Sequence, residues 1–145
     1  MNRTTERHRV VCVDDEEAIL SALRRALRSE PYEVLTTPDP ERALRWVSTR
    51  EVSLIITDQR MPDMEGTELL KEVTRMSPST ARLILTAYPG VVVSRPGVRG
   101  DTECMISKPW DSAMLRRTIR ELLRDRELER TEEEADQELP GFPGA

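Results

Sequence analysis

Short apolar runs alternate along this chain with stretches whose apolar residues recur every three to four positions. The runs lie at residues 10–13, 34–37, 52–57, 81–87 and 103–107. Apolar runs of this length between turn and charge signals are typical of strands buried on both faces, and the 3.6-residue period between them predicts helices. The alternation predicts a doubly wound α/β fold, a five-stranded parallel sheet with helices on both faces.

Polar residues mark where three of the helices begin. Asp39 precedes Pro40, which is favoured at a first helical position. Gly66 precedes the third helix, and Asp111 or Ser112 is expected to cap the last one. The apolar faces are predicted to contain Ile19, Leu20, Leu23 and Leu27, then Ala43, Leu44 and Val47, then Leu69, Leu70, Val73 and Met76, and finally Met114, Leu115, Ile119, Leu122 and Leu123, with Arg116, Arg117 and Arg120 facing outward.

The segment 88–100 is a poor helix former. It contains two prolines, three glycines and a run of valines, and one interior proline alone costs a helix about 3 kcal/mol. A helix between the fourth and fifth strands is therefore expected to be short or irregular, with one or two turns at most.

Length and composition are typical of a single globular domain with an acidic end. A chain of 145 residues that is 37% hydrophobic is one domain's worth. Residues 9–126 are assigned to that domain, and 127–145 to an acidic C-terminal extension, either a helical continuation or a disordered tail. The net charge of −5 lies in residues 131–145, which hold five acids and no basic residue. The balanced remainder lacks the basic surface that a nucleic acid requires.

Cys12 and Cys104 lie inside apolar runs, which favours buried free thiols and a reducing compartment. No apolar stretch approaches the length of about 20 residues that crosses a bilayer. We therefore expect a cytoplasmic protein with no membrane partner. The single histidine, His8, is expected at the solvated surface.

Charged side chains follow three of the predicted strands. Asp14 and Asp15 come after the first strand, Asp58 after the third and Lys108 after the fifth. Because the carboxyl ends of parallel strands meet at one edge of the sheet, these side chains are expected to converge there. Three carboxylates and an ammonium suit a divalent cation and a phosphoryl group, with Asp58 as the candidate nucleophile.

These motifs in this order resemble the receiver domain of two-component response regulators. The resemblance rests on the Asp14-Asp15 pair, Asp58 followed by Met61-Pro62 and Gly66, Thr86 at the end of the fourth strand, and Lys108-Pro109. The string around Asp58 and the ending Lys108-Pro109-Trp110 are similar to receivers of hybrid kinases and of regulators with cyclic-dinucleotide phosphodiesterase output.

The resemblance implies a phosphorylation-dependent switch. Mg²⁺ would be held by Asp14, Asp15, Asp58 and the backbone carbonyl of Arg60. Asp58 would accept a phosphoryl group from a sensor histidine kinase or phosphotransfer protein, while Lys108 neutralises charge and the Thr86 hydroxyl binds the phosphate afterwards. No enzymatic output domain is recognised, so output is expected through contacts with a downstream protein.

The chain departs from the family pattern at Met105, where receivers commonly carry an aromatic residue. This departure and the poor helix at 88–100 favour a monomer, because the usual pairing face would be incomplete. Two alternatives stay open. One is an aspartyl-phosphate phosphotransferase or phosphatase, although the Asp-x-Asp arrangement of haloacid-dehalogenase phosphatases is missing around Asp14. The other is the N-terminal fragment of a longer regulator.

Overall fold

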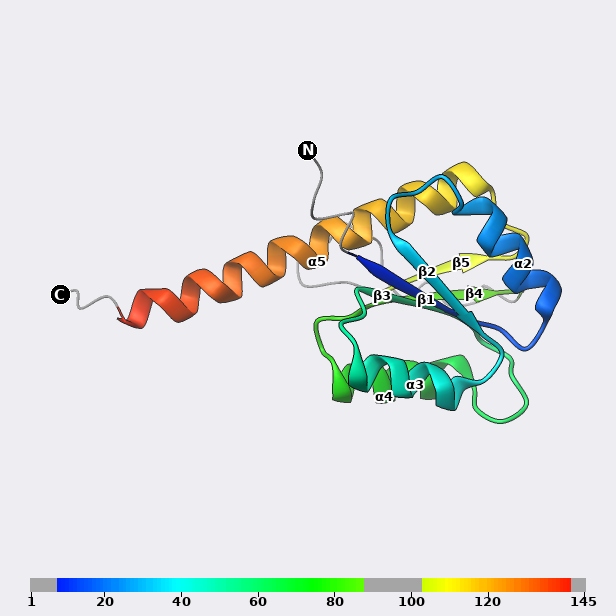
Figure 1. Cartoon of the computed structure of the whole chain (residues 1–145), viewed down its shortest axis with the longest axis horizontal. Coiled ribbons are helices and arrows are strands. Elements are labelled where there is room, and N and C mark those ends of the chain that lie inside the picture. The colour runs from blue at the N-terminus through cyan, green and yellow to red at the C-terminus, as the bar shows by residue number, and fades with distance from the viewer. Residues whose placement is uncertain (1–7, 88–102, 142–145) are drawn as a thin grey trace.

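The computed structural model of the chain describes residues 8–87 and 103–141. Five parallel strands form one sheet in the order β2-β1-β3-β4-β5 (Figure 1). A described helix follows each strand except β4, after which residues 88–102 lie outside the described part of the chain. The elements are β1 (Arg9–Val13), α2 (Glu17–Ala26), β2 (Glu33–Thr37), α3 (Pro40–Thr49), β3 (Leu54–Asp58), α4 (Gly66–Met76), β4 (Ala81–Thr86), β5 (Glu103–Ser107) and α5 (Ser112–Gly141).

Helices cover both faces of the sheet, as predicted. Helices α2 and α5 lie on one face, and α3 and α4 on the other (Figure 1). Alternate residues of β1 contribute to the two cores: Val10 and Cys12 pack with α2 and α5, whereas Val11 and Val13 pack with α3 and α4. Because successive side chains of a strand point to opposite faces of the sheet, the position of a residue in its strand determines the face toward which it projects.

The helix starts follow the sequence signals. The Asp39 carboxylate accepts a hydrogen bond from the backbone amide of Glu41 at 3.0 Å, with Pro40 at the first helical position. Asp111, rather than Ser112, caps α5, because its Oδ1 accepts from the amide of Met114 at 2.9 Å. Such caps satisfy amides that have no partner within the helix.

Four expectations about side chains were wrong. Met76 is 37% exposed and does not join the buried face of α4. His8 is 4% exposed rather than solvated, and its Nδ1 lies 2.6 Å from Ser53 Oγ. Met114 is 41% exposed and does not join the inner face of α5. Arg116 is partly buried rather than outward, since its guanidinium donates to the backbone carbonyl of Ala26 at 3.0 Å.

Three arginines at successive positions along helix α5 bind the rest of the domain. Besides Arg116, the Arg120 guanidinium makes two hydrogen bonds to Glu30, at 2.9 and 2.8 Å. Near the opposite end of the sheet, Arg126 is 2% exposed and donates to the carbonyl of Ser79 at 2.8 Å. Beyond Arg126 the helix runs on to Gly141 and projects past the body of the domain (Figure 1).

Other expectations can be compared directly with the structure. Cys12 and Cys104 are buried and free, as predicted. Within the described residues no helix is long and apolar enough to span a membrane. The segment 88–100, with its predicted short or irregular helix, lies outside the described residues.

Candidate functional site

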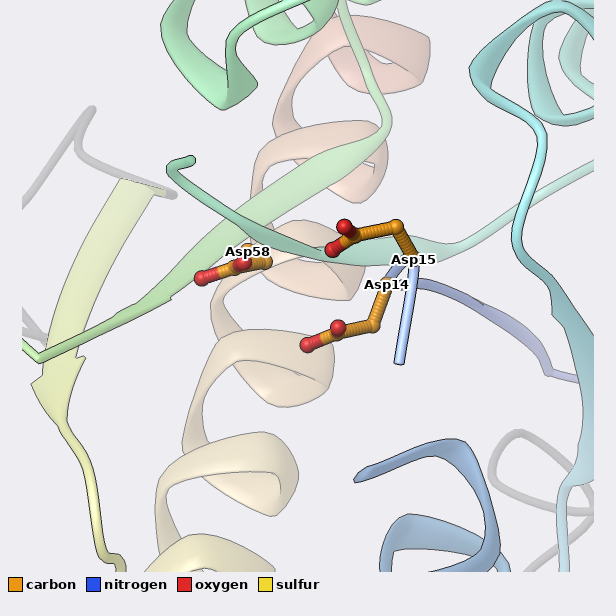
Figure 2. A group of neighbouring side chains, drawn as sticks. All are labelled: Asp14, Asp15 and Asp58. Carbon is orange, nitrogen blue, oxygen red and sulfur yellow. The ribbon is translucent and has the colours of Figure 1, made fainter. Parts of the chain in front are cut away.

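Three carboxylates gather at the carboxyl end of the sheet. Asp14 and Asp15 follow β1, and Asp58 is the last residue of the neighbouring strand β3. Their closest carboxylate oxygens all lie within 4.8 Å of one another (Figure 2). Asp14 is 1% exposed and Asp58 8%, whereas Asp15 is open to solvent. The strand register therefore brings together side chains that are 44 positions apart in the chain.

The Lys108 ammonium bridges two of these carboxylates. Its Nζ lies 3.2 Å from Asp14 Oδ2 and 3.1 Å from Asp58 Oδ1. The lysine is positioned from the edge strand, because its backbone amide donates to the carbonyl of Thr86 at 2.8 Å and so continues the pairing of β4 with β5. A cation between two buried carboxylates offsets their mutual repulsion.

Burial governs the ionisation of this cluster. Removal from water raises the pKa of Asp14 above its ordinary value, although the amide of Glu16, at 2.9 Å, and the Lys108 ammonium oppose that shift. Burial also disfavours the charged form of Lys108, but its hydrogen bond to Asp58 and its attraction to Asp14 outweigh that effect and raise the pKa of Lys108. Burial thus disfavours the charged form of Asp14, whereas the neighbouring carboxylates favour the charged form of Lys108.

Thr86 and Arg60 lie at the borders of the site. Thr86 ends β4, is 3% exposed and pairs in register with Ser107. It therefore stands one strand away from Asp58, which pairs with Leu85. Arg60 lies two positions after Asp58 in the loop that leads to α4, with an exposed side chain. The structure thus places all the predicted site residues around one edge of the sheet.

Gly66 allows the backbone at Asp58 to lie close to the start of α4. A Cβ at this position would collide with the carbonyl oxygen of Asp58 and would lie only 3.1 Å from Gln59 Cα. The Gly66 amide also donates to the Gln59 carbonyl at 2.9 Å. Only a residue without a side chain allows the helix to begin this close to the end of β3.

Gln59 was not singled out from the sequence. Its side-chain amide donates to Glu65 and Thr67, at 3.2 and 3.3 Å, and its Oε1 accepts from the Thr67 amide at 3.1 Å. These contacts close the loop between Asp58 and α4. A glutamine in a polar loop carries no sequence signal of such a role, because the role depends on contacts eight positions away.

Comparison with known proteins agrees with this geometry. The sequence matches the family described as "Response regulator receiver domain" over residues 10–129. It is 34% identical over 134 residues to the hydrogenase transcriptional regulatory protein HoxA of Cupriavidus necator, covering 90% of this chain and 27% of that protein. It is 35% identical over 103 residues to the DNA-binding transcriptional regulator NtrC of a Bradyrhizobium strain, covering 70% of this chain and 21% of the relative.

Solved structures of receiver domains have the same fold as this chain. The signal receiver domain of an HD domain-containing protein from Pseudomonas fluorescens Pf-5 superposes with a TM-score of 0.73 at 31% identity, over 83% of this chain and 98% of that one. A CheY-like response regulator receiver domain protein from Methanospirillum hungatei JF-1 gives a TM-score of 0.73 at 28% identity, over 85% and 98% of the two chains.

The chain spans only about a quarter of the length of the curated regulators it first matches, 27% of HoxA and 26% of the transcriptional regulatory protein GlrR of Escherichia coli. The family match covers residues 10–129, the part of this chain that contains the sheet and the strand-end carboxylates described above. On the sequence match, the superposed structures and the fold, this chain belongs to the response regulator receiver family and is a phosphoreceiver signalling domain.

Proposed function

We propose that Asp58 is the phosphoacceptor of this receiver and that its phosphorylation is the signal. The observation that carries the proposal is the position of the Asp58 carboxylate, at a strand end beside two further carboxylates and 3.1 Å from the Lys108 ammonium. Asp14 is the buried member of the cluster, and Asp15 is its solvent-exposed member. Asp58 occupies the middle of the sheet, where a donor can approach the strand ends.

The chemistry follows from these groups. A carboxylate oxygen of Asp58 attacks the phosphorus of a phosphohistidine on a partner kinase or phosphotransfer protein. The new bond joins Asp58 oxygen to phosphorus, the bond from phosphorus to the histidine nitrogen breaks, and the released imidazole takes up a proton. Lys108 is held where its ammonium can neutralise the added negative charge, which is the main requirement of phosphoryl transfer.

The three carboxylates fit a magnesium ion. Their oxygens lie within 4.8 Å of one another, and the exposed Asp15 leaves the cluster open to solvent, from which Mg²⁺ keeps several water ligands. Asp14, Asp15 and Asp58 would hold the ion together with the Arg60 carbonyl. The bound cation supplies positive charge against the oxygens of the phosphoryl group.

The Thr86 hydroxyl is proposed to bind the phosphoryl group once it is on Asp58. Its position at the end of β4, one strand from Asp58, suits a hydroxyl that donates to a phosphoryl oxygen after transfer. We expect Thr86→Ala to accept phosphate as the wild type does and to lose the conformational response that follows. Output then passes to a downstream protein partner, in keeping with a receiver that acts as a switch and not as an enzyme on external substrates.

The test is phosphorylation by acetyl phosphate with millimolar Mg²⁺, read by intact mass. One phosphoryl group should be added to the wild type and none to Asp58→Asn. Asp63→Asn is the matched control, because Asp63 is an exposed carboxylate in the loop that follows Asp58. A phosphoryl group on Asp58→Asn that maps to Asp14 or Asp15 would refute the assignment.

Magnesium binding is tested separately by the fluorescence of Trp110. This side chain is partly buried two positions after Lys108, and in Trp46→Phe it is the remaining tryptophan of the two in the chain. Titration with MgCl₂ should change its emission with a saturating dependence, and Asp15→Asn should weaken the binding at least tenfold. An unchanged affinity in Asp15→Asn would remove this residue from the proposed ligands.

A further inference from the structure

Gln59 joins the Asp58 carboxylate to the first turn of α4. Its backbone amide donates to Asp58 Oδ1 at 2.9 Å, and the Lys108 ammonium lies 3.1 Å from the same oxygen. Its side-chain Oε1 accepts from the Thr67 amide at 3.1 Å, and its Nε2 donates to Glu65 at 3.2 Å. One residue therefore contacts the proposed phosphoacceptor with its backbone and the start of the next helix with its side chain.

The side-chain amide of Gln59 meets a donor and an acceptor together. The Thr67 amide lies in the first turn of α4, where backbone N–H groups have no partner within the helix. The Glu65 carboxylate is an acceptor and also caps the backbone amide of Glu68. An oxygen and an N–H donor are both required to satisfy these partners, which neither a carboxylate nor an apolar side chain can supply. The residue type at position 59 therefore decides whether these contacts form.

The loop between Gln59 and α4 contains the backbone carbonyl that is proposed as a metal ligand. Arg60 is flanked by Gln59 and by Met61, which is 8% exposed and packs in the core between the sheet and the helices α3 and α4. The Gly66 amide closes the loop on the Gln59 carbonyl at 2.9 Å. The side chain of Arg60 is exposed, so its backbone is placed by the two neighbours.

We infer that Gln59 is a positioning residue for the magnesium site. Its contacts with α4 hold the backbone of residues 58–60 so that the Asp58 carboxylate and the Arg60 carbonyl are available to one ion. The inference rests on the proposed function, in which these two groups bind Mg²⁺. Because Mg²⁺ requires nearly ideal octahedral geometry, a small displacement of either group should lower its affinity. Gln59 acts through its neighbours and does not bind the ion itself.

Two substitutions separate this role from an effect of charge. Gln59→Leu removes every hydrogen bond of the side chain and leaves the net charge unchanged. Gln59→Glu keeps the length of the side chain and an acceptor for the Thr67 amide, but it loses the donor and sets a second carboxylate against Glu65. An added negative charge near the site would by itself tighten cation binding, whereas loss of the contact with Glu65 should weaken it.

Titration with MgCl₂, read by Trp110 emission in the Trp46→Phe background, tests the inference. Gln59→Leu and Gln59→Glu should each weaken Mg²⁺ binding about tenfold, a usual cost of losing a group that orients a metal ligand. Asp39→Ala is the matched control, because it removes the acceptor that caps α3, two strands away from Asp58, and should leave the Mg²⁺ affinity unchanged. Wild-type affinity in Gln59→Leu, tighter binding in Gln59→Glu, or an equal loss in Asp39→Ala would overturn the inference.

A paired exchange should restore the contact. In the double variant Gln59→Glu with Glu65→Gln, the donor and the acceptor change places and the net charge is that of the wild type. This variant should bind Mg²⁺ several-fold more tightly than Gln59→Glu. No recovery would show that the contact between positions 59 and 65 does not set the affinity, and the inference would fail.

Phosphorylation by acetyl phosphate distinguishes failure of this inference from failure of the proposed function. The Mg²⁺ concentration that half-saturates the rate should rise about tenfold in Gln59→Leu, with a smaller change in the maximal rate. Wild-type protein that binds no Mg²⁺ would refute the magnesium site and this inference with it. Wild-type protein that binds Mg²⁺ no more tightly than Gln59→Leu would refute the role of Gln59 alone and leave the assignment of Asp58 intact.

Discussion

Gly66 permits the sharpest test of how the site is built. Alanine in place of a glycine inside a helix ordinarily stabilises a protein by about 0.5–1 kcal/mol, because glycine loses more backbone freedom on folding. At Gly66 we expect the opposite sign. The new Cβ would overlap the Asp58 carbonyl oxygen and would stand 3.1 Å from Gln59 Cα and 3.2 Å from the Asp58 carbonyl carbon.

The magnitude follows from those contacts. All three atoms belong to the backbone, so no flexible side chain can move aside, and forced overlap of this kind costs about 1–3 kcal/mol. After subtraction of the helix gain, Gly66→Ala should lower the free energy of unfolding by up to about 2.5 kcal/mol, or the melting temperature by up to roughly 8 °C. The displaced backbone is that of Asp58, so the rate of phosphorylation should fall as well.

The assays are urea unfolding and the time course of phosphorylation by acetyl phosphate. Lys71→Ala is the matched control, since Lys71 is exposed on the same helix, and it should change both quantities little. A Gly66→Ala protein as stable as the wild type and phosphorylated at the wild-type rate would show that the helix start tolerates a side chain. The close approach would then have no bearing on the position of Asp58.

Three further predictions concern buried groups. Arg126→Met should destabilise the fold by about 1–3 kcal/mol, because the Ser79 carbonyl loses its charged donor, whereas the exposed Arg124→Met should be near neutral in the same urea titration. Burial raises the pKa of Cys12 to about 12, so the thiol stays neutral at pH 8, and iodoacetamide should label it only after unfolding. Burial raises the pKa of Asp14 in the folded protein above its value in the unfolded chain. Protonation of Asp14 therefore stabilises the fold fully at pH values below the pKa of the unfolded chain, and this contribution is lost as the pH rises through the pKa of the folded protein. Without Mg²⁺, Asp14→Asn should therefore be more stable than the wild type at pH 7, and this advantage should shrink toward pH 4; a constant advantage would contradict it.

The order of elements and the meeting of the charged residues could be read from the sequence. Four-to-seven-residue apolar runs indicate where parallel strands end, and the topology then brings Asp14, Asp58 and Lys108 together whatever their spacing. The roles assigned to those residues remain predictions, because geometry shows proximity and not chemistry. The match to the receiver family was also visible in the motifs, since they occur at successive strand ends.

The features that the sequence did not reveal depend on packing. His8 precedes the first strand and looks solvated, but the strand register carries it beside Ser53, 45 positions away. Met114 is apolar and was expected on the inner face, yet α5 buries the side that carries Leu115 and Ile119 and leaves Met114 41% exposed. Arg126 appears as one of many helix arginines, and only the loop that ends at Ser79 makes it a buried anchor.

Strand β1 packs in both cores of the domain and leads directly to Asp14 of the candidate site. Its residues alternate between the two cores, and Asp14 follows directly after its last residue. Loss of one residue between Arg9 and Val13 would turn the side chains beyond the deletion to the opposite face of the sheet and move Asp14 out of the cluster. The length of a loop at the opposite end of the sheet does not change this alternation. Natural variation in length among proteins with this site should therefore gather at that far end, and β1 should keep its length while its residues change.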